Sequence, residues 1–307
     1  MKRREALRAL GLSTAGIVLA PQLAVAQEKK PASAKFRFCL NTSTISGQKA
    51  GVQKYIEIAS QAGYDGVELW VQDVKDYKVQ GNSIKSLKKF LDDSHIIVYD
   101  AIGFAPWMVE DEAQRKAGFS QMKQEMELMS ELGCTRIAAP SSGVSAEVPL
   151  NLVNVGERYK QLLDLGRQTG VMPQLEFWGS SPVFYSMGQA LMVAAAANDP
   201  DVHILPYVYH LFRGGSGFEC LKMVNGNIID VIHFNDYPSS IPPEQQKDSD
   251  RLYPGDGVAP FKEIIADLSG MGGIKVLSLE LFNREYWKQD PLLVAKTGLE
   301  KMRKIAS

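Results

Sequence analysis

The sequence predicts an α/β fold, a single-domain (β/α)8 TIM barrel that follows an N-terminal signal peptide. Short apolar runs of strand length alternate with helical segments from residue 35 to residue 307. This alternation is typical of parallel α/β folds. The structural alternative is a doubly wound open sheet. No G-x-G-x-x-G follows the first run, which weighs against a dinucleotide-binding version of that fold.

The first half of the barrel is built from clear strand and helix patterns. Strands are expected at 36–40, 66–70, 96–102 and 135–139, where the runs are apolar. Helices are expected at 52–62, 84–93 and 112–132. In the last of these, Met122, Met126 and Met129 recur on one face at helical spacing. Gly63 and Gly133 follow two of these helices as stop signals.

The second half continues the same alternation. Strands are expected at 172–177, 202–209, 228–234 and 275–281. Helices are expected at 151–169, 187–197, 217–224, 260–268 and 291–305. The total of eight strands, each followed by a helical segment or a turn-rich loop, is what the barrel requires.

The N-terminus is predicted to be a twin-arginine signal peptide, residues 1–26. Arg3 and Arg4 precede an apolar segment from Leu10 to Ala20, and an A-x-A cleavage site ends at Ala26. An ordinary Sec signal is the alternative. Residues 27–34 form a polar linker, and the barrel takes residues 35–307. A periplasmic or otherwise exported protein is therefore expected, with no membrane segment left after cleavage.

Composition excludes several broad classes of partner. Apolar residues make up 45% and charged residues 22% of the chain, with a net charge of −1. These values are typical of a globular protein and give no general attraction to nucleic acid. The three cysteines, Cys39, Cys134 and Cys220, are interpreted as structural, and a disulfide framework is not expected.

Polar residues lie at the ends of four late strands. Glu176, His210, His233 and Glu280 each follow or end an apolar run. In a (β/α)8 barrel the C-terminal strand ends meet at the active site. A buried charge is costly unless it is compensated, so these groups are expected to converge and neutralise one another, most simply on a metal ion. Two facing glutamates can also act as an acid and a base.

Other residues are expected to contact a substrate. Asp236, three residues after His233, is interpreted as a second oxygen ligand or as a partner of the histidine. Arg251 lies in a turn-rich loop and is expected to reach over the pocket, although a solvated loop arginine would fit the sequence nearly as well. A set of residues near strand ends completes the candidate substrate-binding group: Glu68, Trp107, Trp178, Tyr207. Barrel packing is the alternative for the aromatic members.

These segments together resemble the sugar phosphate isomerase/epimerase family, the xylose isomerase-like barrels, from about residue 36 onward. The resemblance rests on Gly63 to Trp70, on Leu132 to Ile137, and on four short segments near the later strand ends: Leu175-Glu176-Phe177, His210 to Gly215, His233-Phe234-Asn235-Asp236, and Glu280. It implies an enzyme acting on a sugar, a keto-sugar or a cyclitol, and a divalent metal (Mn, Co, Mg or Zn) as cofactor. Barrel helices in this family often pair subunits, so it also implies a homo-oligomer.

The resemblance implies specific roles. Glu176, His233 and Glu280 fall on three of the four metal ligands of the family, and the two glutamates fall on its acid/base pair. His210 falls on a substrate-binding histidine, and Arg251 on a loop arginine that touches the sugar. The fourth ligand, an aspartate, is replaced by Tyr207. A neutral tyrosine is a poor ligand for a hard cation.

Three alternatives follow for the metal. Three protein ligands and water would hold it, or His210 or Asp236 would replace the missing aspartate, or the site is metal-free. The first functional hypothesis is a periplasmic isomerase, epimerase or lyase that moves a proton beside a carbonyl. The second is a non-catalytic sugar-binding protein. A metal-dependent endonuclease ranks last, because only four histidines are present and the chain has no basic groove pattern.

Overall fold

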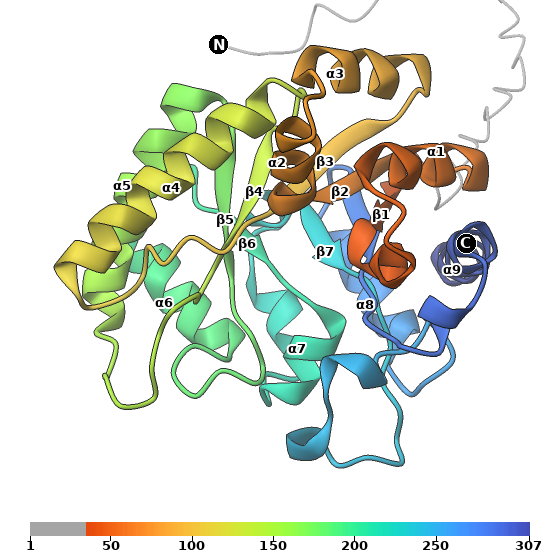
Figure 1. Cartoon of the computed structure of the whole chain (residues 1–307). Coiled ribbons are helices and arrows are strands. Elements are labelled where there is room, and N and C mark those ends of the chain that lie inside the picture. Colours follow the sequence, from red (N-terminus) through yellow and green to blue (C-terminus); the bar gives the residue numbers. More distant parts are fainter. Residues whose placement is uncertain (1–34) are drawn as a thin grey trace, which may run out of the picture. The chain divides into compact units, whose positions relative to one another are not determined.

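The computed structural model describes residues 35–307, and the predicted signal peptide and linker (residues 1–34) lie outside these residues (Figure 1). Eight strands alternate with helices in this part of the chain, which confirms the predicted fold class. The strands are β1 (Phe36–Asn41), β2 (Gly66–Trp70), β3 (Ile97–Ile102), β4 (Arg136–Pro140), β5 (Met172–Glu176), β6 (Ile204–Leu205), β7 (Val231–His233) and β8 (Lys275–Leu279). The helices are α1 (Val52–Ala62), α2 (Val71–Val79), α3 (Ile84–Asp93), α4 (Glu112–Ser130), α5 (Leu152–Thr169), α6 (Met187–Ala197), α7 (Val208–Arg213), α8 (Phe261–Gly270) and α9 (Pro291–Ala306).

All described strand pairs are parallel and form two arcs of one barrel. One arc has the order β3-β2-β1-β8-β7, and the other has the order β4-β5-β6. A single parallel bridge between Tyr207 and His233 joins the arcs on one side, where the His233 amide donates to Pro206 O at 3.0 Å. The two arcs therefore meet, on this side of the barrel, next to residues that were expected to form the site.

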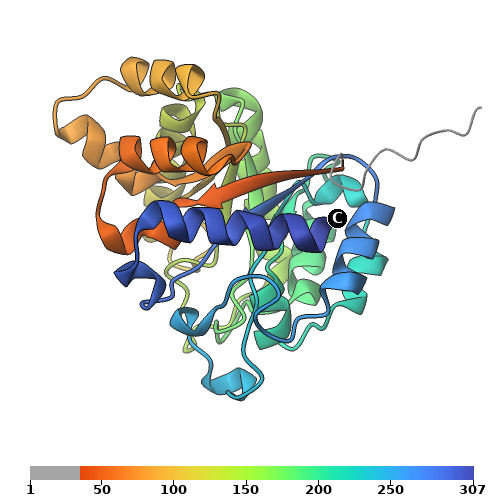
Figure 2. The same ribbon diagram turned by 90° about the vertical axis from the view of Figure 1, so that its right-hand side faces the viewer.

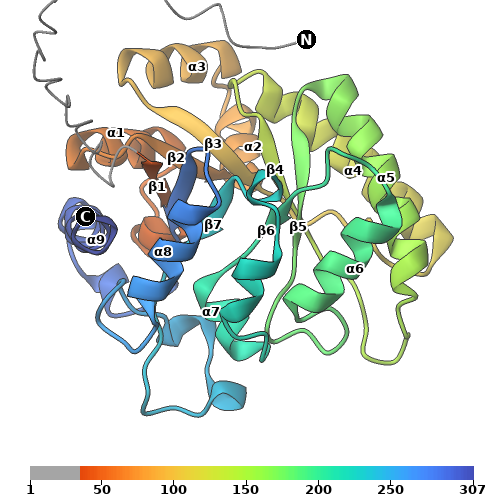
Figure 3. The ribbon, with the colours of Figure 1, turned by 180° about the vertical axis from the view of Figure 1, so that it is seen from behind.

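The helices cover the outer face of the strands and bury their apolar sides. Figure 2 shows α9 alongside α1, over β1. Figure 3 shows α4, α5 and α6 over the β4 and β5 side. Apolar side chains from both layers, such as Leu40, Val67, Leu162 and Leu299, are buried in one core. This burial is the main free energy that stabilises the barrel.

The strand predicted at 202–209 is wrong for most of its length. Only Ile204 and Leu205 pair as β6, and Pro206 has no N–H with which to continue the ladder. The chain then turns at Tyr207, which is the N-cap of α7. Consequently Tyr209 and His210 lie on a short helix at the mouth of the barrel and not in a strand.

Two other predicted elements are shorter in the structure than the sequence predicts. The predicted helix 217–224 is a 3-10 segment, Glu219–Met223, and the predicted strand 228–234 shortens to β7. The structure also contains α2 and the 3-10 segment Thr42–Gln48, which the sequence patterns do not predict. Among the described residues, no helix is long and apolar enough to cross a membrane.

Candidate active site

A cavity of about 260 Å³ lies at the C-terminal ends of the strands, where the fold places an active site. Five lining residues follow or end strands: Trp70, Ile102, Glu176, Tyr207 and Glu280. The other lining residues come from the loops and from α7: Phe104, Trp178, Ser180, His210, Asp248, Arg251 and Phe282. Glu176, Glu280, His210, Arg251, Trp178 and Tyr207, all predicted as site residues, are thus brought together.

Glu176 ends β5 and is buried, with one carboxylate oxygen free. Its Oε1 accepts from Trp178 Nε1 at 2.5 Å and from the Tyr207 hydroxyl. Its Oε2 has no hydrogen-bond partner among the described residues. Burial raises the pKa of Glu176 to about 7, against the lowering effect of the Tyr207 hydrogen bond. The carboxyl group can therefore both accept and release a proton near neutral pH.

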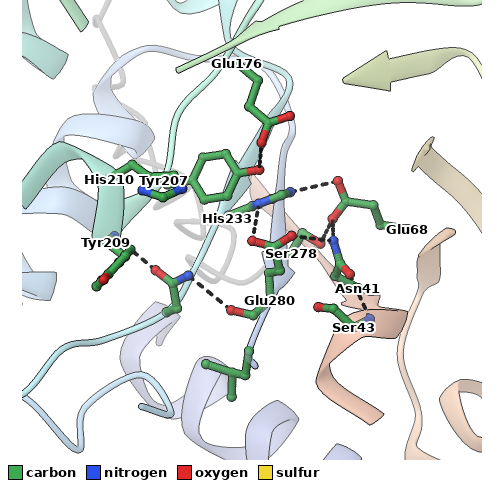
Figure 4. Close-up of polar contacts among 12 residues, drawn as sticks. Asn41, Ser43, Glu68, Glu176, Tyr207, Tyr209, His210, His233, Ser278 and Glu280 are labelled. Atoms are coloured by element: carbon green, nitrogen blue, oxygen red, sulfur yellow. Dashed lines mark hydrogen bonds and ion pairs between the residues drawn. The ribbon is translucent and has the colours of Figure 1, made fainter. Parts of the chain in front are cut away.

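Tyr207 lies between Glu176 and His233 (Figure 4). Its ring centroid is 3.9 Å from that of His233 and 4.5 Å from that of His210. Burial, followed by the charges of Glu176 and Glu280, raises the pKa of Tyr207 well above its usual value. The residue is therefore a neutral phenol whose hydroxyl group donates a hydrogen bond to Glu176.

Glu280 follows β8 and is held by three groups. Its Oε2 accepts from Arg251 Nη1 at 2.6 Å and lies 3.1 Å from His233 Nδ1. Its Oε1 accepts from Asn41 Nδ2 at 3.2 Å. Burial would raise the pKa of Glu280, but His233 and Arg251 outweigh burial and lower it. Glu280 is therefore a carboxylate fixed in ion pairs.

Arg251 is almost fully buried, with 2% of its surface exposed, and is not a solvated loop arginine. Besides Glu280, it donates from Nη2 to Asp248 at 2.5 Å and faces His210 Nε2 at 3.3 Å. Its guanidinium carbon lies 4.7 Å from the centre of the Tyr209 ring. The positive charge is thus fixed at the wall of the cavity by ion pairs and an aromatic face.

His233 lies beneath the cavity, with both ring nitrogens facing carboxylates. Its Nε2 is 2.7 Å from Glu68 Oε1, and its Nδ1 faces Glu280. Burial alone would lower the pKa of His233, but the charges of Glu280 and Glu68 raise it well above its usual value. Glu68 Oε2 also accepts from Asn41 at 2.7 Å and from Ser278 at 2.6 Å (Figure 4). His233 is therefore held between two carboxylates, by a hydrogen bond to Glu68 and by a 3.1 Å ion pair with Glu280.

His210 differs from His233 in charge. Burial, and then the nearby Arg251, lower the pKa of His210 well below its usual value. Because Arg251 only donates, the Nε2 that faces it is the accepting nitrogen, and the proton of the neutral ring is on Nδ1. This Nδ1 has no partner among the described residues. His210 thus gives the cavity a neutral donor.

Aromatic rings form the apolar wall of the cavity. Phe104 lies 5.2 Å from Trp70 and 6.2 Å from Trp178, centroid to centroid, and Phe282 lies 6.0 Å from Trp70. Phe104 is 41% exposed, so the wall extends to the mouth. Such a wall suits the apolar face of a sugar ring.

Three predicted substrate-binding residues lie elsewhere. Asp236 accepts four backbone amides, those of Tyr237, Gly255, Gly257 and Ala259, at 2.8–2.9 Å. Its carboxylate shapes the loop after Leu252 and is not free for a substrate or a metal. A Cβ at position 257 would collide with Asp236 Oδ1, so this turn requires glycine.

Trp107 and Glu68, which were also predicted to bind substrate, do not line the cavity. Trp107 is fully buried, donates to Pro140 O at 3.0 Å and packs on Tyr159. It belongs to the core, as barrel packing would have it. Glu68 is also fully buried and contacts His233 instead of the cavity. Glu68 lies within β2 and Trp107 lies in the loop after β3, and neither side chain lines the cavity.

The predicted metal ligands do not fit a metal ion in this arrangement. No three His, Cys, Asp or Glu residues in the part of the chain described here are grouped to hold one. Both ring nitrogens of His233 face carboxylates, and the oxygens of Glu280 are bound by Arg251 and Asn41. The Tyr207 hydroxyl takes up Glu176 Oε1. The predicted ligands do not fit a metal ion because Tyr207 places a phenol where the resemblance implies a carboxylate.

Several residues of the site were missed by the sequence analysis. Asn41 ends β1 and Ser278 lies in β8, and both bind Glu68. Asp248 and Phe282 line the cavity from loops. Asn41 could have been found by the same rule that found Glu176, because it is the polar residue at the end of an apolar strand.

Comparisons with known proteins place this architecture in a family. The family model described as xylose isomerase-like TIM barrel matches residues 56–305. An inosose isomerase of Bacillus velezensis is 25% identical over 88% of this chain and 97% of its own length. An inosose isomerase of Bacillus subtilis is 25% identical over 87% of this chain and 95% of its own length.

Solved structures agree in fold. The structure of the IOLI protein with a binding zinc atom has a TM-score of 0.80 and 23% identity, and covers 88% of this chain and 98% of its own. D-psicose 3-epimerase, solved in the presence of D-fructose, has a TM-score of 0.70 and 16% identity over 88% of this chain and 99% of its own. The prediction of an isomerase/epimerase-type enzyme is confirmed at the level of the family. The chain belongs to the xylose isomerase-like TIM barrel family.

Proposed function

We propose that the protein is a sugar or keto-sugar isomerase that moves a proton beside a carbonyl group, with Glu176 as the acid–base residue. The single observation that carries the proposal is Glu176, which lines the cavity and whose buried Oε2 has no hydrogen-bond partner among the described residues. The inosose isomerases and the epimerase among the similar proteins support the substrate class. Here a carbonyl on a polyhydroxylated ring or chain is the substrate.

The reaction follows from the charge states of the site. In its carboxylate form, Glu176 takes the proton from the carbon next to the carbonyl. The electron pair of that C–H bond moves toward the carbonyl and leaves an enediolate. Glu176, now protonated, returns the proton to the former carbonyl carbon. The hydroxyl proton of the carbon that was deprotonated passes to the former carbonyl oxygen, so that the carbonyl is transposed. A pKa of about 7 suits both steps.

One free carboxyl group favours isomerisation over epimerisation. Epimerisation by two bases needs a second group that delivers a proton to the opposite face, the role predicted for Glu280. Arg251 and Asn41 hold both oxygens of Glu280, and its pKa is lowered. We therefore assign Glu280 to positioning Arg251. Glu176 alone carries out the transfer, on one face of the enediolate.

The remaining groups bind the sugar. The aromatic wall of Trp70, Phe104 and Phe282 packs on the apolar face of the ring. The unpartnered Nδ1 of His210 donates to a hydroxyl or carbonyl oxygen of the substrate. The volume of about 260 Å³ suits one monosaccharide or cyclitol unit. We also propose, from the sequence of residues 1–26, that the chain is exported by the twin-arginine route.

A product screen tests the proposed activity. The full chain is incubated with inososes, ketohexoses, aldohexoses and 3-keto-glycosides, and products are followed by NMR. We expect turnover of one of these carbonyl compounds, with a loss in kcat of about 10²–10⁴-fold in Glu176→Gln. Glu127→Gln, an exposed glutamate on α4, is the matched control. Saturable sugar binding without any turnover would overturn the proposal in favour of a non-catalytic sugar-binding protein.

A further inference from the structure

The phenol of Tyr207 stands at the centre of the site, where one more carboxylate would be needed for a cation. Its hydroxyl binds Glu176, and its ring packs edge-on against His233 (Figure 4). The ring is 2% exposed, so it fills this space and does not swing aside into solvent. A neutral phenol offers a hard divalent cation far less than a carboxylate does.

The carboxylates next to Tyr207 already have partners within the chain. His233 faces a carboxylate from each nitrogen, at 2.7 Å for Glu68 and at 3.1 Å for Glu280. Arg251 contacts Glu280 Oε2 at 2.6 Å, and Asn41 donates to Glu280 Oε1 at 3.2 Å. Both oxygens of Glu280 are therefore occupied, one of them by the guanidinium of Arg251.

Arg251 has the position and rigidity of a built cationic group. It is buried, lies at the cavity wall, and is held by Glu280, Asp248 and the face of Tyr209. Its Nε has no partner among the described residues. A guanidinium can donate to an oxyanion while it keeps its carboxylate pair.

We propose that Arg251 stabilises the enediolate in this protein, and that Tyr207 has converted the site to one that works without a divalent metal. The inference rests on the proposed function, since it assumes an enediolate. When Glu176 removes the proton, the C–H electron pair forms the C=C bond and the π pair of the carbonyl moves onto its oxygen, which accepts a hydrogen bond from Arg251. The π pair of the C=C bond forms the new C–H bond when the proton is delivered, and no electrons leave the substrate.

Metal binding, measured without substrate, tests the first half of the inference. The full chain is stripped with EDTA, desalted, and incubated separately with Mn²⁺, Co²⁺, Zn²⁺ and Mg²⁺. Bound metal is determined by mass spectrometry and affinity by calorimetry. We expect less than about 0.1 ion per chain for the wild type and for Tyr207→Phe, and about one ion per chain for Tyr207→Asp, since a carboxylate is the harder ligand. Near-stoichiometric metal in the wild type, or a folded Tyr207→Asp that binds no ion, would overturn the proposal.

Kinetics in EDTA test the second half. We expect unchanged kcat on chelation, a loss of about 100-fold or more in Arg251→Gln, and partial rescue by Arg251→Lys. Arg213→Gln is the matched control, because Arg213 lies at the end of the same short helix as His210, and its one hydrogen bond within the described residues goes to Glu244 O, at 3.5 Å. Loss of activity in EDTA that metal restores would contradict the proposal. A chain that turns over no carbonyl sugar would defeat the proposed function, while the metal measurement would still stand.

Discussion

The hydroxyl group of Tyr207 donates to Glu176 Oε1, and the other oxygen of this carboxylate is left without a partner. The hydrogen bond fixes Oε1 of the carboxyl group and leaves Oε2 for the proposed proton transfer. It also favours the carboxylate form, against the burial that raises the pKa of Glu176. Tyr207 is therefore a positioning residue for the proposed base.

Tyr207→Phe removes this hydrogen bond and keeps the ring. Because the bond lowers the pKa of Glu176, its loss raises that pKa further, by about one unit. The limb of kcat/KM that rises with pH should move to higher pH by the same amount, and kcat at high pH should change little. A pH–rate profile of both proteins checks this. A limb that stays in place would show that another group titrates.

The raised pKa of Glu176 has a consequence for stability. Between the ordinary value of 4.5 and the folded value of about 7, the folded chain keeps a proton that the unfolded chain releases. The free energy of unfolding contributed by this group therefore falls as pH rises through this window, by about 3 kcal/mol in total.

Glu176→Gln cannot titrate and should lose this pH dependence. Urea unfolding of both proteins at pH 5 and pH 8 measures the difference. Glu127→Gln should keep the wild-type dependence, because Glu127 is exposed. Equal dependence in the wild type and Glu176→Gln would contradict the assignment of the raised pKa.

Asp236→Asn should destabilise the loop that carries Arg251. The carboxylate of Asp236 accepts four backbone amides, and an asparagine oxygen can replace only one side of it. We expect a loss of about 2–4 kcal/mol in the free energy of unfolding and a lower kcat. Asp256→Asn is the control in the same loop, because Asp256 is half-exposed and pairs only with Lys301. Stability equal to wild type in Asp236→Asn would contradict this structural role.

Phe104→Ala should weaken substrate binding without changing the chemistry. Phe104 is the exposed end of the aromatic wall and packs against Trp70 and Trp178. We expect KM to rise about 10-fold with kcat nearly constant, as for the loss of an aromatic contact that binds ground state and transition state alike. A variant at Val79, which is exposed outside the cavity, is the control. A fall in kcat with KM unchanged would show that Phe104 acts in the transition state.

The fold could be predicted because the local signals agree with the global one. Apolar runs such as Ile137 to Ala139 and helix stops such as Gly63 give element type and order directly. The prediction of the sixth strand was wrong over residues 206–209 because Tyr207, Val208 and Tyr209 are residue types that favour strands. Their helical turn depends on Pro206 ending the ladder and on packing around β7, which are tertiary effects.

The position of the site could be predicted from the sequence, but most contacts of its side chains could not. Glu176 and Glu280 were found because a carboxylate at the end of a buried strand is costly unless it has a use. Asp236 has the same sequence context, yet its side chain turns toward backbone amides of a distant loop. Which way a strand-end side chain points, and whether Arg251 is buried, depend on loops whose paths the sequence pattern does not show.

The position of a solvent deuteron in the product tests the central claim most directly. The reaction is run in D2O with the substrate found in the screen, and the product is examined by NMR. A single acid–base residue, Glu176, predicts deuterium on the carbon next to the one that lost its proton, in the carbonyl-transposed product. It also predicts that recovered substrate exchanges with its configuration retained. Deuterium on the original carbon with inverted configuration would contradict the account, because inversion requires a second acid on the opposite face.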